Sequence, residues 1–367
     1  MQSALLWYNT FKETLVKMGF TLNPYDPCVA NQTIHGRQCT ICWYVDDMKI
    51  SHERSSVVDK VIKEIEKSFG KMTVTRGPKH TFVGIDIDFR GDGTVMLSMD
   101  QYIKECISVY EDEVTKTSPT PAKGNLFDND KEDESTTLPE PEAEKFHHAV
   151  AKLLYASKRT RIDIDLAVSF LCTRVASPTK GDKKKLIKVL EYLKLCPSLP
   201  RIIGTNGELE MHTWVDASYA THRDMRGHTG GTTSMGRGMV FHGSMKQKLN
   251  TKSSTESEVV GVSDYIPHTI WAKYFLMEQG YNLSRNVFYQ DNTSAIKMIK
   301  NGKQSCSGTS RHIHIRYFFT KDVIEREKMI VKHCPTKQMI ADYFTKPIQD
   351  KQFYELKILS WVPTTRY

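Results

Sequence analysis

Four acidic residues in the C-terminal half of the chain stand where regular structure begins or ends: Asp216, Glu258, Asp291 and Asp342. Asp216 and Asp291 each follow an apolar run typical of a strand, whereas Glu258 and Asp342 lie in segments with helical patterns. A single Asp after a strand is usually only a cap or turn residue. Four carboxylates that meet at one end of a sheet could not all stay ionised without cations, and their oxygens suit Mg²⁺ or Mn²⁺. The pattern therefore predicts a divalent-metal site.

A second pair of acids, Asp46 and Asp47, stands between two apolar runs in the N-terminal half, Thr40 to Tyr44 and Met48 to Ile50. This arrangement predicts a hairpin with both carboxylates at its tip. Such a pair is usually a solvated turn. The chemistry that needs it is nucleotidyl transfer, in which carboxylates at a strand turn hold two metal ions.

The elements that would position these acids can be read from the hydrophobic periodicity. In the first 124 residues we expect helices over 1–20, 56–69 and 100–110, strands over 28–30, 40–44 and 95–97, and one strand over 81–88. The stretch 125–144 is acidic and contains prolines, which predicts a flexible linker. Residues 146–195 have the apolar spacing of helices.

The composition is that of an intracellular protein with two or three domains. The 367 residues carry a formal net charge of +8, a mild basic excess compatible with a nucleic-acid partner. Eight cysteines without a secretory signal indicate a reducing compartment. No apolar run approaches the ~20 residues of a membrane span. Cys39 and Cys42 form a C-x-x-C without a second pair, and we interpret them as two strand cysteines rather than as a metal or redox site.

Several short motifs follow one another along the chain: Tyr44-Val45-Asp46-Asp47, Phe82-Val83-Gly84-Ile85-Asp86-Ile87, Ser118-Pro119-Thr120-Pro121, Lys152-Leu153-Leu154-Tyr155 and Ala341-Asp342-Tyr343-Phe344-Thr345-Lys346-Pro347. In this order they resemble the motifs of Ty1/copia-type retrotransposon reverse transcriptases. The resemblance covers nearly the whole chain. It identifies the sequence with the C-terminal part of a Pol polyprotein.

The resemblance implies a mixed α+β and α/β fold with several parts. Residues 1–124 would be a partial reverse transcriptase palm and thumb, an antiparallel sheet with helices. An acidic linker over 125–145 and a helical connection over 146–200 would follow. Residues 201–347 would form an RNase H-like domain, a mixed five-stranded sheet with flanking helices, and 348–367 a C-terminal tail. In that domain we expect strands over 229–235 and 239–242, with 245–250 as a further strand of the meander.

The RNase H domain of such elements would use Asp216, Glu258, Asp291 and Asp342 as catalytic metal ligands. Two Mg²⁺ or Mn²⁺ ions would then activate water and stabilise the leaving oxygen in phosphodiester hydrolysis. The expected substrate is the RNA strand of an RNA–DNA hybrid, which the 2′-OH distinguishes from DNA. Glu256 is an alternative to Glu258, because both have capping-box spacing. Glu258 is favoured because the family's acid directly precedes an apolar stretch.

Three further residues have expected roles near this site. His333 lies in the loop before Asp342 and is either structural or a catalytic group that moves protons or helps product leave. Arg311 and Arg316 resemble the family's basic stretch near the substrate, which predicts nucleic-acid binding through phosphate contacts.

The resemblance assigns Asp46 and Asp47 to a polymerase palm whose third carboxylate and fingers lie upstream of this sequence. We therefore expect an N-terminally truncated piece that does not synthesise DNA by itself. The implied partners are an RNA–DNA hybrid and either remaining Pol segments or a second copy, in a cytoplasmic particle or the nucleus. The alternative hypothesis is an inactive or co-opted remnant of a transposable element that binds nucleic acid without cutting it.

Overall fold

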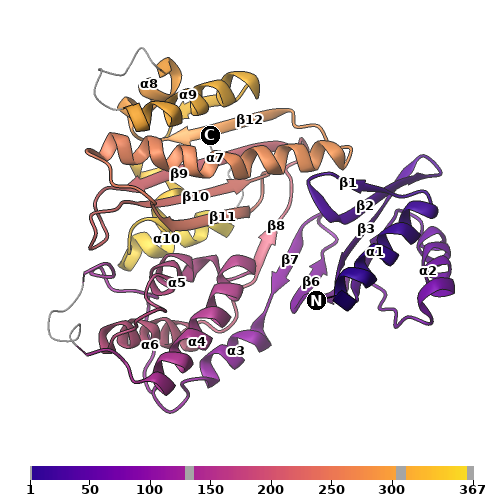
Figure 1. Ribbon diagram of the computed structural model, residues 1–367, viewed down its shortest axis with the longest axis horizontal. Coiled ribbons are helices and arrows are strands. Elements are labelled where there is room, and N and C mark those ends of the chain that lie inside the picture. Colours follow the sequence, from indigo (N-terminus) through magenta and orange to yellow (C-terminus); the bar gives the residue numbers. More distant parts are fainter. Residues whose placement is uncertain (1, 129–135, 303–310, 362–367) are drawn as a thin grey trace. The chain divides into compact units, whose positions relative to one another are not determined.

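The computed structural model in Figure 1 describes residues 2–128, 136–302 and 311–361. By its internal contacts the chain divides into two compact units. The first comprises Met1–Asp88 with Trp271–Asn282, and the second Phe89–Ile270 with Leu283–Tyr367. None of the helices in the described ranges is both long enough and apolar enough to cross a membrane.

The first unit contains a four-stranded antiparallel sheet in the order β1-β2-β3-β4. Its elements are α1 (Gln2–Lys17), β1 (Thr21–Asn23), β2 (Asp26–Ile34), β3 (Arg37–Tyr44), β4 (Asp47–Ser51), α2 (Ser55–Phe69), β5 (Lys79–Phe82) and β6 (Ile85–Phe89). The apolar stripes of both helices pack on the sheet, with Phe11 of α1 and Ile65 of α2 buried against Ile41 and Trp43. In the last hairpin Tyr44 pairs with Asp47.

The prediction of one strand over 81–88 is wrong. The segment contains β5 and β6, which form an antiparallel hairpin in which Phe82 pairs with Ile85. Val83 and Gly84 make the turn, and both have positive φ, at 52° and 68°. Such two-residue turns suit the twist of the flanking strands. The apolar alternation continues through the turn, so periodicity alone did not indicate it.

The second unit begins with β7 (Val95–Ser98), which pairs with β8 (Arg201–Ile203), and with the helices between them. These helices are α3 (Asp100–Ser108), α4 (Glu140–Arg159), the short 3₁₀ helix η1 (Ile162–Ile164), α5 (Asp165–Cys172) and α6 (Lys180–Leu195). Within the range predicted to be a linker, Leu126 and Phe127 are buried, and α4 already begins at Glu140.

A mixed five-stranded sheet in the order β11-β10-β9-β12-β13 forms the rest of the second unit. The elements are β9 (Glu210–Ser218), β10 (His228–Ser234), β11 (Met239–Lys246), α7 (Ser254–Glu278), β12 (Arg285–Gln290), α8 (Thr293–Asn301), α9 (Arg311–Arg326), β13 (Ile330–His333), the 3₁₀ helices η3 (Thr336–Gln338) and η4 (Ile340–Phe344), and α10 (Asp350–Trp361). Strands β9, β10 and β11 are antiparallel, whereas β12 is parallel to β9 and β13. The mixed sheet expected for this part is confirmed.

The predicted break between strands 239–242 and 245–250 is wrong. β11 is a single strand that ends at Lys246 and pairs with β10 from Met239 to Lys246, with one irregularity between Met239 and Phe241. Gly243 and Ser244 interrupt the apolar pattern, but Gly243 pairs directly with Gly231 of β10. Two glycines face each other across the ladder, so the small residues mark a closely packed site rather than a strand end.

Both faces of the sheet are covered, which holds its strand ends in place. On one face Val215 and Phe288 pack against Val259 and Ile266 of α7, which Figure 1 shows lying over the sheet. On the other face Trp214 belongs to a core that includes η4, α10 and the helices α4 to α6. The central strands β9 and β12 are therefore buried on both sides.

Candidate metal centre

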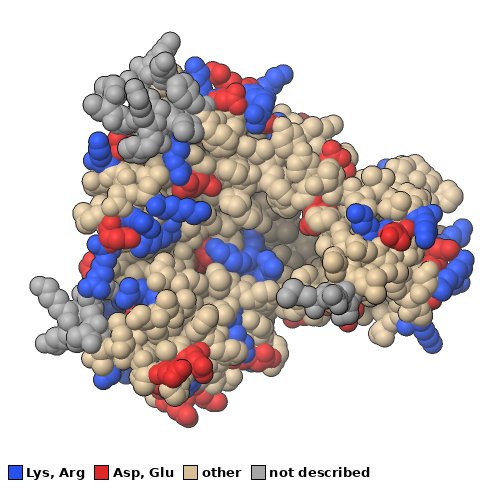
Figure 2. Space-filling view, in the orientation of Figure 1, with Lys and Arg blue, Asp and Glu red and all other residues tan. Residues whose placement is uncertain are grey.

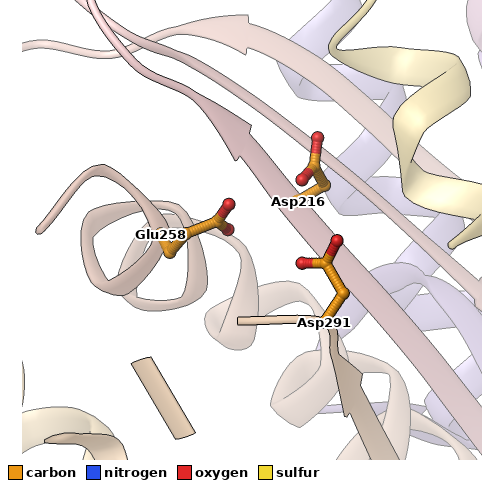
Figure 3. Close-up of side chains that lie close together, drawn as sticks. All are labelled: Asp216, Glu258 and Asp291. Carbon is orange, nitrogen blue, oxygen red and sulfur yellow. The ribbon is translucent and has the colours of Figure 1, made fainter. Parts of the chain in front are cut away.

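Asp216 and Asp291 lie together because β9 and β12 are parallel neighbours whose carboxyl ends reach the same edge of the sheet. The ladder pairs Trp214 with Tyr289, so Asp216 and Asp291, each two residues further along, lie at nearly the same level. Glu258 reaches this edge from the start of α7. One carboxylate oxygen from each of the three lies within 4.8 Å of the other two, and Figure 3 shows the side chains pointing toward one another.

The two candidate glutamates at the start of α7 have different contacts. Ser253 Oγ accepts a hydrogen bond from the backbone N–H of Glu256 at 3.2 Å, and the Glu256 carboxylate accepts one from Lys252 N at 2.7 Å. Glu256 is therefore used in capping the helix. Glu258 is only 6% exposed and accepts a hydrogen bond from Gln290 Nε2 at 3.2 Å. The structure brings Glu258, and not Glu256, to Asp216.

Asp342 is linked to Asp216 through Lys346. It lies in η4, and Lys346 stands between the two carboxylates, with Nζ 2.7 Å from Asp342 Oδ1 and 3.5 Å from Asp216 Oδ2. The Thr345 hydroxyl donates a short hydrogen bond to Asp216 Oδ2. Three of the four predicted acids thus form a compact group, and the fourth is joined to Asp216 through Lys346.

Gly230 allows η4 to come this close. It pairs with Asp216 across the β9–β10 ladder. A Cβ on Gly230 would lie 2.6 Å from Thr345 Cγ2 and 2.7 Å from Phe344 Cβ, both too short for real contacts. The absence of a side chain there lets the segment that carries Asp342 rest directly on the sheet.

Burial and the repulsion between neighbouring carboxylates raise the pKa values of Glu258, Asp291 and Asp342. Burial, followed by the carboxylates of Asp216 and Asp291, raises the pKa of Glu258 well above its ordinary value of 4.5. Burial and then Asp216 raise the pKa of Asp291, and the same two causes raise the pKa of Asp342 to about 7. Burial opposes the charge of Lys346, but the Asp216 and Asp342 carboxylates outweigh it and raise the lysine pKa. The carboxylates therefore repel one another, and a cation placed among them, such as the Lys346 ammonium, is stabilising.

A buried chain of hydrogen bonds through Ser244, His228 and His222 holds η4 by its Phe344 carbonyl. Ser244 Oγ donates to the Phe344 carbonyl at 2.8 Å, His228 Nε2 lies 2.7 Å from Ser244 Oγ, and His222 Nε2 lies 3.0 Å from His228 Nδ1. The serine has one proton and uses it on the carbonyl, so His228 must donate to the serine and His222 must donate to His228. Burial lowers the pKa of His222 to about 4 and that of His228 well below its ordinary value, which agrees with neutral rings.

Among the other predicted site residues that the structure describes, His333 lies next to the group of acids, and Arg316, Asp46 and Asp47 have other surroundings. His333 ends β13, is exposed, and its Nε2 is 3.0 Å from the Asp291 carbonyl oxygen, so its ring borders the site. Arg316 is paired with Asp264, while the side chain of Arg311 lies outside the described residues. Asp46 and Asp47 are exposed, and among the described residues neither joins a metal-sized group of His, Cys, Asp or Glu.

Sequence reasoning missed the groups that surround the acids. Thr336 donates a hydrogen bond to Asp291 Oδ2 at 3.2 Å, and Gln290 binds Glu258 while its amide oxygen accepts the Asp291 backbone N–H. Lys346 had a usable signal, because a cation four residues after Asp342 has the spacing of an ion pair on one helical face. His228 and Ser244 had none, because their partners lie far away in the sequence.

Comparison with curated proteins finds relatives along almost the entire chain. A retrovirus-related Pol polyprotein from transposon TNT 1-94 of Nicotiana tabacum is 27% identical over 357 residues, which are 96% of this chain. The corresponding polyprotein from transposon RE1 of Arabidopsis thaliana is 26% identical over 96% of the chain, and a transposon Ty5-1 protein of Saccharomyces cerevisiae is 25% identical over 72%. The chain resembles a segment of a Ty1/copia-type Pol polyprotein. The resemblance seen in the motifs is thereby confirmed.

This Pol-like chain spans only part of its longer relatives: 26% of the tobacco polyprotein and 24% of the Arabidopsis one, but 85% of the Ty5-1 protein. No protein-family model matches it. Among solved structures, RNase H1 from Halobacterium salinarum covers 37% of this chain and 93% of its own length at 10% identity and a TM-score of 0.28. The protease–reverse transcriptase of prototype foamy virus covers 95% and 39% at 12% identity and a TM-score of 0.25.

Proposed function

We propose that residues 201–347 form a divalent-metal-dependent ribonuclease that hydrolyses the RNA strand of an RNA–DNA hybrid. The observation that carries the proposal is the convergence of Asp216, Glu258 and Asp291, three acids from three different elements, within 4.8 Å. The similarity to retrotransposon Pol polyproteins supports a nuclease attached to a reverse transcriptase-like part.

The donor set fits a hard divalent cation. All the candidate ligands are carboxylate oxygens, which Mg²⁺ and Mn²⁺ prefer, and oxygens that share one Mg²⁺ at about 2.1 Å lie about 3 to 4 Å apart. The group needs only small side-chain movements to close to that spacing. Lys346 already places one positive charge between Asp216 and Asp342, so this edge stabilises a cation.

The residues have separable tasks in this proposal. Asp216, Glu258, Asp291 and Asp342 would hold two Mg²⁺ or Mn²⁺ ions. When bound, these ions supply Lewis-acid polarisation of the scissile phosphate and a water of lowered pKa. Gln290 holds the Glu258 carboxylate, and Thr336 holds the Asp291 carboxylate.

We propose that His333 moves protons at the rim of the site. Its ring is exposed and lies against the Asp291 carbonyl, within reach of a substrate bound over the acids. In this proposal the ring accepts and releases a proton during turnover, because histidine is the side chain that most often serves as a general acid or base. In this proposal it assists proton transfer or product departure and holds no metal.

Electrostatics support a polyanionic substrate. The chain carries a net charge of +8, and Figure 2 shows Lys and Arg groups gathered over the middle of the visible face of the second unit. Arg311 and Arg316 of α9 are proposed phosphate contacts, and Arg316 would exchange its pairing with Asp264 for a phosphate.

The test is cleavage of a labelled RNA–DNA hybrid in Mg²⁺, with double-stranded DNA and double-stranded RNA as competing substrates. Asp291→Asn should lower the hybrid cleavage rate by a factor on the order of a hundred or more, because it removes a ligand of the metal ions. Asp322→Asn changes the same functional group on the exposed surface of α9, and should cleave like the wild type. Equal cleavage by Asp291→Asn and the wild type would contradict the proposed site. Binding of the hybrid without any cleavage by the wild type would favour the nucleic-acid-binding remnant instead.

We also propose that this polypeptide does not synthesise DNA by itself. Asp46 and Asp47 stand on an exposed hairpin, and within the described residues no third acid, histidine or cysteine joins them in a metal-sized group. A primer-extension assay with the isolated chain should show no incorporation of deoxynucleotides. Extension that is lost in Asp46→Asn would contradict the proposal.

A further inference from the structure

Lys346 stands at the entrance of the acidic group and enters it from solvent. Its side chain is 44% exposed, whereas the side chains of Asp342 and Asp216 are 5% and 2% exposed. The ammonium therefore reaches two carboxylates that are themselves almost completely buried. Its contacts are those of a counter-ion: 2.7 Å to Asp342 Oδ1 and 3.5 Å to Asp216 Oδ2.

The backbone fixes the lysine in this position. The N–H groups of Thr345 and Lys346 both donate to the Asp342 carbonyl, at 3.2 and 2.9 Å, so the chain turns tightly after η4. The turn directs a hydroxyl and an ammonium from consecutive residues onto Asp216. The close approach over Gly230 holds the same segment against the sheet. Lys346 is thus built into the architecture of the site.

The position that the ammonium takes is one that a metal ion would need. Asp216 lies close to two sets of groups: Glu258 and Asp291, and Lys346 with Asp342. An ion bound by Asp216 and Asp342 and an ammonium bound to the same oxygens would repel each other at close range. Both cannot hold these oxygens at once.

We propose that Lys346 is a tethered cation that occupies the edge between Asp216 and Asp342 in the metal-free protein and leaves it when a divalent ion binds there. The inference rests on the proposed function, because it assumes that these carboxylates bind metal. It assigns Lys346 two effects. The ammonium holds the crowded acids together before metal arrives, and it weakens the affinity for metal at the Asp342 edge. Lys346 is a positioning residue in this sense.

The decisive experiment is a calorimetric titration of the full chain with Mn²⁺ in the absence of nucleic acid. Lys346→Gln should bind Mn²⁺ about tenfold more tightly than the wild type, because no charge-assisted hydrogen bond has to be broken first. Lys346→Arg retains the charge and should bind like the wild type. Lys337→Gln removes one charge from an exposed residue of nearby η3 and should change the affinity less than about twofold, since exposed charges are screened.

A second readout uses thermal unfolding of the same variants. In EDTA, Lys346→Gln should unfold at a lower temperature than the wild type, because the acids lose their counter-ion, and saturating Mn²⁺ should remove the difference. Mn²⁺ affinity of Lys346→Gln that equals or falls below that of the wild type would overturn the role of Lys346. Absence of Mn²⁺ binding in the wild type and in every variant would instead overturn the metal site, and the proposed function with it.

Discussion

Asp342→Asn should make the metal-free protein more stable while it impairs the proposed reaction. The carboxylate is buried, 5% exposed, and faces Asp216, and its pKa is raised to about 7 from an ordinary value of 3.8. At about 1.36 kcal/mol per pH unit, this gap corresponds to about 4 kcal/mol of unfavourable free energy for the charged form in the folded state. Asparagine keeps the shape of the side chain and removes the charge.

The net gain is smaller than this upper value. The substitution also removes the charge that faces Lys346, although the asparagine oxygen can still accept a hydrogen bond from the ammonium. We therefore expect a net stabilisation of about 1 to 3 kcal/mol in EDTA at pH 8, which corresponds to a rise of about 2 to 6 °C in Tm for a unit of this size.

The pH dependence has a definite sign. The group is an acid whose folded-state pKa is raised, so its charge destabilises the fold fully above about pH 7, and the effect disappears as the pH falls toward 3.8. The stability difference between Asp342→Asn and the wild type should thus be about 2 kcal/mol larger at pH 8 than at pH 5.5. Added Mg²⁺ should stabilise the wild type more than the variant, because the variant lacks one ligand.

The assay is thermal unfolding of both proteins in EDTA and in Mg²⁺ at the two pH values. Asp322→Asn, on the exposed surface of α9, is the matched control and should show no such pH-dependent difference. A variant that is less stable than the wild type in EDTA at pH 8, or a difference that does not change with pH, would refute the reasoning that Asp342 is surrounded by negative charge.

Three further predictions follow from the surroundings of the site. Gly230→Ala should lower hybrid cleavage at least about tenfold and destabilise the protein by about 1 to 3 kcal/mol, because its Cβ would collide with Thr345 and Phe344; unchanged cleavage and Tm would contradict this. Ser244→Ala should cost about 1 to 3 kcal/mol in urea unfolding, because His228 and the Phe344 carbonyl lose their partner; a cost below about 0.5 kcal/mol would count against the hydrogen-bonded chain. His222 and His228 have lowered folded-state pKa values, so their contribution is present above pH 6.5 and is lost as the pH falls toward 4, by about 1.4 kcal/mol per pH unit for each ring. The slope of stability against pH in that window should be correspondingly smaller in His228→Asn, and an unchanged slope would show that the ring is not held neutral.

Local patterns in the sequence were sufficient for most elements. The strand that carries Asp216, the helix that carries Glu258 and the Asn292 cap after Asp291 all follow from short-range periodicity and capping. Local patterns failed at Val83 and Gly84, where a hairpin turn continues the alternation, and at Gly243, where small residues lie inside a strand. In both places pairing with another strand decided the structure.

The sequence by itself determined the types of residue available, four acids at element ends, and the elements that carry them. The tertiary structure decided which of these side chains meet. It used Glu256 as a helix cap and brought Glu258 to Asp216 and Asp291. It linked Asp342 to Asp216 through Lys346, and His228 to the Phe344 carbonyl through Ser244. The physical reason is distance along the chain. A helix cap or a strand pattern depends on neighbours within a few residues. The meeting of Asp216, Glu258 and Asp291, and the bonds of Ser244 to His228 and Phe344, join groups 16 or more residues apart and exist only after the sheet and its covering helices have packed.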